Sequence, residues 1–163
     1  MLNKKCKKSA LGGTFSFLHI GHKFFLKEAL KISEELIIGI SSDEFARKLD
    51  KKHPIEPYEV RALKVLNFCL KEIKTGQKIT IFPLDDPYGP TIWDGELDCI
   101  IVSEETYARA LEINSIRINR GLRPLNVIKV KLLTDEKGKK ISSTLLWKRY
   151  GSIFTDKIKR NFS

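Results

Sequence analysis

The sequence predicts an α/β fold built on a doubly wound sheet of five parallel strands. Strand-like and helix-like segments alternate along the chain, which is the pattern of helices that connect parallel strands. Two strand-like segments, "LIIGI" and "CIIV", are apolar throughout, as strands are when helices cover both faces of a sheet. Each unusual segment of the sequence follows a predicted strand, at the sheet edge where such folds bind ligands.

The expected strands lie at residues 7–11, 35–40, 78–84, 98–102 and 125–133. The expected helices lie at residues 22–34, 41–49, 57–75 and 103–121, and a last helix opens at 142–144. Ser42 or Asp43 caps the second helix, and Pro57 suits the first turn of the third. Gly121 suits the left-handed position that commonly follows the end of a helix.

The composition predicts one domain, residues 1–163, because no linker divides the chain. No apolar run approaches the roughly 18 residues of a membrane span, and the first residues do not form a signal peptide. We therefore expect a cytoplasmic protein without membrane contact. The formal charge of +10 favours polyanionic partners such as nucleotides. The sequence does not define an oligomeric state.

The three cysteines predict neither a disulfide nor a metal site, because they are widely spaced and form no CxxC pair. Cys69 and Cys99 lie in apolar stretches, so we expect them to be small buried hydrophobic residues.

The segment "GGTFSFLHIGH", residues 12–22, combines groups that suit phosphate binding. Gly12 and Gly13 let the backbone approach a ligand closely, and Thr14 offers a hydroxyl and an amide. His22 is expected at the start of a helix, where backbone N–H groups favour anions, and His19 lies one turn earlier. We interpret the segment as a phosphate-binding loop rather than as a helix cap alone.

The segment "GKKISST", residues 138–144, predicts a second anion site at the same edge of the sheet. Lys139 and Lys140 place positive charge before the last predicted helix. Hydroxyl residues then open that helix: Ser142, Ser143 and Thr144. Two such sites suit a chain of phosphates.

The sequence contains no P-loop, GxGxxG, HExxH or GxSxG signature. It also offers no nucleophile with a dedicated base. Transfer between phosphates needs neither, since the attacking phosphate is already an oxyanion and the protein mainly positions groups and stabilises charge.

With "HIGH" at residues 19–22 and a C-terminal "ISST", the chain resembles the nucleotidyltransferase superfamily that carries the HxGH signature. The segments "GISSDEF", "PYEVR", "VSEETYARALEIN" and "KKISSTLL" extend the resemblance to archaeal-type phosphopantetheine adenylyltransferases and to the matching domain of eukaryotic CoA synthase. The similarity covers nearly the whole chain in order. It implies a Rossmann-like nucleotidyltransferase fold and an enzyme of coenzyme A biosynthesis. Such an enzyme transfers AMP from ATP to 4′-phosphopantetheine and gives dephospho-CoA and pyrophosphate.

The resemblance also implies roles for individual residues. Thr14, His22 and Lys52 would be catalytic, and Mg²⁺ would be bound through the ATP phosphates, with no metal ligand from the protein. ATP and its phosphates would contact Gly12, Gly13, Phe15, His19, Ser103, Glu104, Ser142, Ser143 and Thr144.

The phosphate of the acceptor would be held by Lys52, with Lys48 and Lys51 as alternatives. Arg61 is a further candidate, or it forms a structural ion pair. Ser16 departs from the family pattern, which usually has Asp after "GGTF", so this position offers no carboxylate to place metal or substrate.

Two other functions fit parts of the sequence. The same scaffold serves adenylyl- and cytidylyltransferases whose acceptor is nicotinamide mononucleotide, FMN or glycerol phosphate, and "VSEETYARALEIN" disfavours them. A nucleic-acid-binding module would use the basic runs "NKKCKK", "KGKK" and "KIKR", but no aromatic platform accompanies them.

Overall fold

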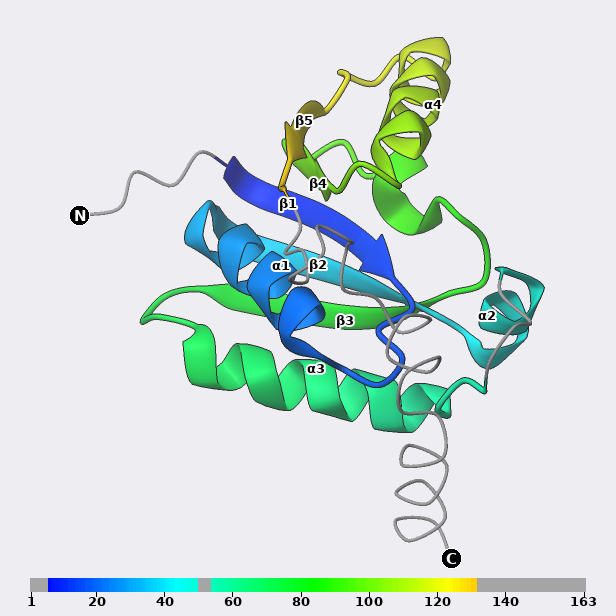
Figure 1. Ribbon diagram of the computed structural model, residues 1–163. Coiled ribbons are helices and arrows are strands. Elements are labelled where there is room, and N and C mark those ends of the chain that lie inside the picture. Colours follow the sequence, from blue (N-terminus) through cyan, green and yellow to red (C-terminus); the bar gives the residue numbers. More distant parts are fainter. Residues whose placement is uncertain (1–5, 50–53, 132–163) are drawn as a thin grey trace, which may run out of the picture.

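The computed structural model describes residues 6–49 and 54–131 (Figure 1). Its elements in chain order are β1 (Cys6–Gly13), α1 (Ile20–Lys31), β2 (Ser33–Ser41), α2 (Asp43–Leu49), α3 (Tyr58–Glu72), β3 (Lys78–Leu84), the short 3₁₀ helix η1 (Gly89–Ile92), β4 (Cys99–Val102), α4 (Tyr107–Asn119) and β5 (Asn126–Lys129). The helix predicted at 142–144 lies outside the described residues.

The five strands form one parallel sheet in the order β3-β2-β1-β4-β5. The chain builds outward from β1 to β3 and then crosses back to β4 on the other side of β1. The order therefore reverses between β1 and β4, which is the position where doubly wound sheets open a crevice. The predicted Rossmann-like α/β fold is confirmed.

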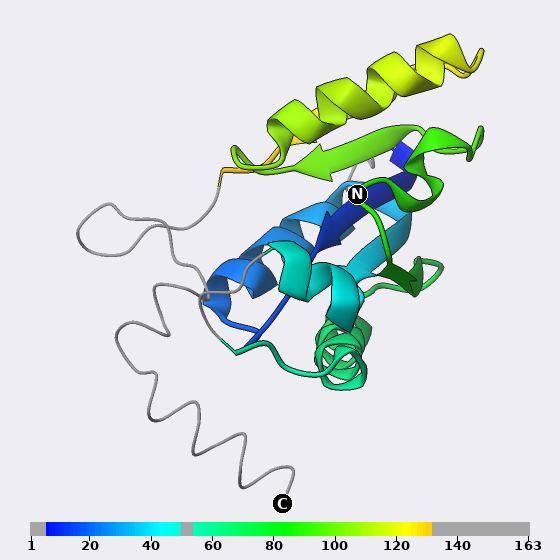
Figure 2. The same cartoon turned by 90° about the vertical axis from the view of Figure 1, so that its right-hand side faces the viewer.

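Two apolar cores cover opposite faces of this sheet. The first includes Leu26 of α1, Val65 of α3 and Ile38 of β2. The second includes Ile113 of α4 and Ile37 of β2. Because successive residues of a strand point to opposite faces, α4 lies across the sheet from the α1 and α3 pair. Figure 2 shows α4 beside β4, well away from α3.

Several elements differ at their boundaries from the prediction, and local contacts explain the differences in β1 and α4. β1 continues through Gly12 and Gly13, which pair with Gly39 and Ile40 of β2. α4 begins at Tyr107 instead of Ser103.

The late start of α4 follows from a turn that precedes it. The backbone N–H of Ser103 donates to the hydroxyl of Thr106 at 3.0 Å, which closes this turn ahead of the helix. The other end of α4 agrees with the prediction. Gly121 is left-handed, with φ of 77°, and Leu122 N–H donates to the carbonyl of Arg117 at 2.8 Å.

The prediction for the cysteines was wrong in one respect, because Cys6 and Cys99 form a disulfide. They are separated by 93 residues in sequence, but β1 and β4 are neighbours in the sheet and bring their Cα atoms to 6.1 Å. Cys69 is buried as expected, and burial raises the pKa of its thiol to about 12.

None of the helices within residues 6–49 and 54–131 is both long enough and apolar enough to cross a bilayer.

Candidate active site

A cleft of about 510 Å³ opens at the carboxyl edge of the sheet. It lies beside the reversal of strand order between β1 and β4, where ligands are expected in folds of this kind. Residues predicted to bind ligand that line it are Gly12, Gly13, Thr14, Phe15, His19, His22 and Ser103. One concave site thus brings together both ends of "GGTFSFLHIGH" and the start of "VSEET".

The two histidines fix the start of α1. Nδ1 of His19 accepts hydrogen bonds from the backbone N–H groups of Gly21 at 3.0 Å and His22 at 3.4 Å. Nδ1 of His22 accepts in return from the backbone N–H of His19 at 3.3 Å. This reciprocal cap starts the helix at Ile20, two residues earlier than predicted. The two rings stack with centroids 3.7 Å apart.

These caps determine which atoms can donate to a phosphate. A neutral imidazole that accepts at Nδ1 carries its proton at Nε2. His19 and His22 can therefore each donate from Nε2–H. The sequence predicts an anion beside the backbone N–H groups of this helix start, with further hydrogen bonds donated by histidine. The side chain of His19 accepts from two of them, so the imidazole Nε2–H groups are the better candidates.

Residues 14–19 are here called the phosphate loop. The Phe15 side chain of this loop packs so closely that the residue beside it, Gly13, has no room for a side chain. Phe15 is left-handed, with φ of 54°, and is only 4% exposed. Its ring meets the ring of His22 edge-on at 5.4 Å between centroids. A Cβ on Gly13 would lie 2.8 Å from the Phe15 ring. Gly13 is therefore required for the packing of Phe15, in addition to giving a ligand access to the backbone.

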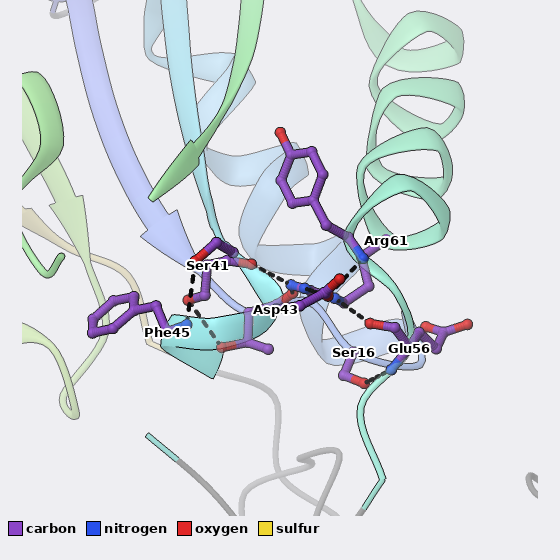
Figure 3. A network of polar contacts seen from close by, with 9 residues as sticks. Ser16, Ser41, Asp43, Phe45, Glu56 and Arg61 are labelled. Carbon is purple, nitrogen blue, oxygen red and sulfur yellow. Dashed lines mark hydrogen bonds and ion pairs between the residues drawn. The ribbon is translucent and has the colours of Figure 1, made fainter. Parts of the chain in front are cut away.

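Of the two roles predicted for Arg61, contact with a substrate phosphate or a structural ion pair, the structure shows the ion pair. Its side chain is fully buried and pairs with Asp43 at 2.9 Å. It also donates to three backbone carbonyls, those of Glu56 at 2.7 Å, Thr14 at 2.9 Å and Ser41 at 2.8 Å (Figure 3). The guanidinium therefore joins three segments of the chain from within and does not reach the cleft.

The three lysine candidates for the acceptor phosphate are placed differently. Lys48 is exposed, pairs with Glu44 at 3.5 Å on α2 and does not line the cleft. Lys51 and Lys52 lie outside the described residues. The same holds for Ser142, Ser143 and Thr144. The roles of all five remain predictions.

Glu104, which was predicted to contact ATP, lies outside the cleft, and the residues that follow it line the cleft. Glu104 is exposed and pairs with Lys129 at 2.9 Å, so it does not line the cleft. Glu105 and Thr106 line it instead. The turn that precedes α4 causes this shift, since a helix starting at Ser103 would have given a different register.

Sequence reasoning missed several residues of the cleft. The hydroxyl of Ser41 lies 3.2 Å from that of Thr14, and Tyr88 also lines the cleft. Both follow predicted strands, which were expected to end at residues 40 and 84. Arg109 lies in "VSEETYARALEIN" but was assigned no role, and in the structure its guanidinium lies over the Tyr88 ring at 5.7 Å. Tyr88 donates a hydrogen bond to Glu112, which raises the pKa of the phenol.

The described lining residues suit positioning chemistry more than acid–base chemistry. Most are apolar or glycine, and the charged ones among them are Glu105 and Arg109. Within residues 6–49 and 54–131, no group of three or more His, Cys, Asp or Glu side chains is arranged to hold a metal ion. Hydroxyl and imidazole groups can donate hydrogen bonds to phosphate oxygens. A reaction between bound phosphates depends mainly on such donors, which position the phosphates and stabilise their charge.

A doubly wound parallel sheet with a cleft at its switch point is the architecture of many nucleotide-binding α/β proteins. Residues 10–149 match the cytidylyltransferase-like family, and the chain belongs to that family.

Within that family, the chain is similar to curated proteins named phosphopantetheine adenylyltransferase. The chain is 41% identical over 140 residues to a phosphopantetheine adenylyltransferase of Methanopyrus kandleri, covering 86% of this chain and 88% of that protein. It is 37% identical over 145 residues to the protein of the same name from Pyrococcus furiosus, covering 89% of each. A crystal structure of a protein of unknown function from Archaeoglobus fulgidus matches with a TM-score of 0.68 and 34% identity, covering 83% of this chain and 99% of that one. The resemblance seen in the sequence is confirmed.

Proposed function

We propose that this protein transfers AMP from ATP to 4′-phosphopantetheine. An oxygen of the acceptor's phosphate attacks the α-phosphorus of ATP in line. The bond from that phosphorus to the oxygen bridging to the β-phosphate breaks, so pyrophosphate leaves and dephospho-CoA forms. The observation that carries the proposal is a cleft with phosphate-type donors, in a chain 41% identical over most of its length to a protein of that name.

The residues divide into those that meet the reacting phosphates and those that hold the ends of ATP. Thr14 donates at the α-phosphate, and His22 donates from Nε2–H to the phosphates that leave. His19 supports His22 through the shared cap and the stacked rings. Lys52, or Lys51 in its place, holds the acceptor's phosphate, and the "ISST" residues bind the β- and γ-phosphates.

Mg²⁺ fits this site as an ion carried by ATP. A magnesium ion usually keeps several waters and binds through substrate phosphates, so it needs no cage of protein ligands. Bound there, it neutralises charge on the phosphates. Ser16 is 2% exposed and accepts a hydrogen bond from the backbone N–H of Glu56 at 3.2 Å. We assign this position to holding the loop instead of to holding the ion.

The test is pyrophosphate release from ATP and Mg²⁺ with separate acceptors. Parallel reactions contain 4′-phosphopantetheine, nicotinamide mononucleotide, FMN or glycerol phosphate. They are run at 25 °C and at about 70 °C, because 31% of the residues are charged and such a bias is seen in hyperthermophile proteins. We expect release with 4′-phosphopantetheine alone, with dephospho-CoA identified by mass. Release with only another acceptor replaces the substrate but keeps the chemistry. Silence with every acceptor, in folded protein, contradicts the function.

A further inference from the structure

The phosphate loop contains a second left-handed residue that its own sequence does not favour. Phe17 has a φ of 52°, a region in which a bulky side chain is strained. Strain of this kind persists only where the surrounding structure holds it in place. Phe17 lies between Thr14 and His22, so its conformation affects where both of these residues point.

The side chain that holds Phe17 comes from outside the loop and outside the cleft lining. The carboxylate of Glu56, 2% exposed, accepts a hydrogen bond from the backbone N–H of Phe17 at 2.6 Å. Its other oxygen pairs with Lys64 of α3 at 2.5 Å. The backbone N–H of Glu56 donates to Ser16 Oγ, so the same residue contacts two adjacent loop positions (Figure 3).

Burying the Glu56 carboxylate costs desolvation free energy that packing alone does not explain. Burying a charge requires a partner and hydrogen bonds, and an apolar residue of similar size is often at least as stabilising. The Glu56 carboxylate instead accepts a hydrogen bond from the backbone N–H of Phe17, the left-handed residue. Its carbonyl also accepts from Arg61, which donates in turn to the carbonyl of Thr14. The loop is therefore held at Thr14, Ser16 and Phe17.

We propose that Glu56 is a positioning residue for the transfer reaction, acting through Phe17 on the placement of Thr14 and His22. This proposal rests on the proposed function for its kinetic consequence. Lys64 pairs with the other carboxylate oxygen of Glu56, so its role is to stabilise Glu56 instead of to order the loop directly.

The test compares Glu56→Ala, Glu56→Gln and Lys64→Met with Glu59→Gln, an exposed acidic residue in the first turn of α3, as the control. Glutamine keeps an oxygen that can accept from Phe17 N–H, and alanine removes it. Hydrogen exchange of the Phe17 amide and ATP affinity are measured without acceptor. The kcat and KM of pyrophosphate release are then measured with 4′-phosphopantetheine.

We expect Glu56→Ala to exchange the Phe17 amide about tenfold faster or more, because a hydrogen bond to a charged group is lost. Its kcat should fall about 10²-fold, as expected when reacting groups are misplaced by about 1 Å, with a smaller change in KM. Glu56→Gln should restore kcat to within about threefold of the wild type, and Lys64→Met should lower the melting temperature more than kcat. Glu59→Gln should change neither the exchange of the Phe17 amide nor kcat.

Two results overturn the proposal. One is a wild-type kcat in folded Glu56→Ala, and the other is a glutamine variant as slow as the alanine variant although its Phe17 amide stays protected. If Glu56→Ala does not fold, Glu56→Asp replaces it, because its carboxylate is one C–C bond too short to keep the 2.6 Å contact. If the wild type itself is silent with the acceptor, the proposed function fails, and amide exchange and ATP affinity still decide whether Glu56 orders the loop.

Discussion

The two edges of the sheet are built in opposite ways. At the amino edge, the Cys6–Cys99 disulfide ties β1 to β4, and Asp98 accepts hydrogen bonds from the backbone N–H groups of Lys7 and Lys8. At the carboxyl edge, the same two strands end at an open cleft beside a strained loop.

The comparison shows how a small protein can carry a strained site. The covalent cross-link lies at the edge opposite the cleft. The edge with the cleft is held by a buried network under the loop instead of by closure of the cleft itself. Strain at functional sites is sustained by well-determined structure elsewhere, and this division between the edges is one way to provide it.

The largest expected effect comes from removing the centre of the network at the carboxyl edge. Arg61→Ala leaves three backbone carbonyls and Asp43 without the guanidinium, and should lower the free energy of unfolding by about 3 to 5 kcal/mol. Urea unfolding measures the change. The exposed Arg47→Ala on α2 is the control and should stay within about 0.5 kcal/mol. A similar loss in both variants would show that the buried network does not stabilise this edge.

Removing the disulfide should separate stability from activity. The double variant Cys6→Ala/Cys99→Ala should lose about 2 to 4 kcal/mol of unfolding free energy, because the cross-link restricts the unfolded chain. Its turnover at 25 °C should equal that of the wild type, since the disulfide lies at the opposite edge from the cleft. A reductant should lower the melting temperature of the wild type and leave the double variant unchanged. A loss of turnover in folded double variant would contradict the separation of the two edges.

A smaller effect should follow from adding one methyl group beside the phosphate loop. In Gly13→Ala the new Cβ displaces the Phe15 ring, at a cost of about 1 to 3 kcal/mol in stability. Turnover should fall as well, because Phe15 packs on His22. Gly95→Ala is the control, since its Cβ would meet only Leu122 at an ordinary 3.7 Å. Equal turnover in both variants would remove Gly13 from the site.

The smallest effect is a pH dependence at the amino edge. Burial pushes the pKa of Asp94 upward, but hydrogen bonds from Lys8 and from the backbone of Glu96, with the charge of Lys8, hold it below its usual value. The hydrogen bond to Asp94 in turn raises the pKa of Lys8.

The sign of the dependence follows from these two directions. The contribution of Asp94 is complete above pH about 4 and is lost as the pH falls through its folded pKa. That of Lys8 is complete below pH about 10 and is lost as the pH rises through its own folded pKa. Urea unfolding between pH 2 and 5 should show a difference of about 1 kcal/mol between wild type and Asp94→Asn that shrinks toward the acid end. A constant difference would show that the charge of Asp94 does not contribute.

The elements with a strong local signal were predictable from sequence. Strand β3 occupies the predicted residues 78–84, and Gly121 ends α4 as expected. The disulfide was not predictable, because only the sheet order makes Cys6 and Cys99 neighbours. Glu56 gave no signal either, since its role depends on a backbone N–H 39 residues away. Local patterns thus indicate elements and loops, and contacts between distant segments need the fold.

The measurement that tests the central claim most directly is the turnover of His22→Ala. If His22 donates from Nε2–H to the phosphates that leave, the variant should lose about 2 to 4 kcal/mol of transition-state stabilisation, or roughly 30- to 1,000-fold in rate. His22→Asn controls for the helix cap, because its side-chain oxygen can still accept from the His19 N–H. It should be as slow as His22→Ala but more stable than that variant. Wild-type turnover in folded His22→Ala would contradict the account.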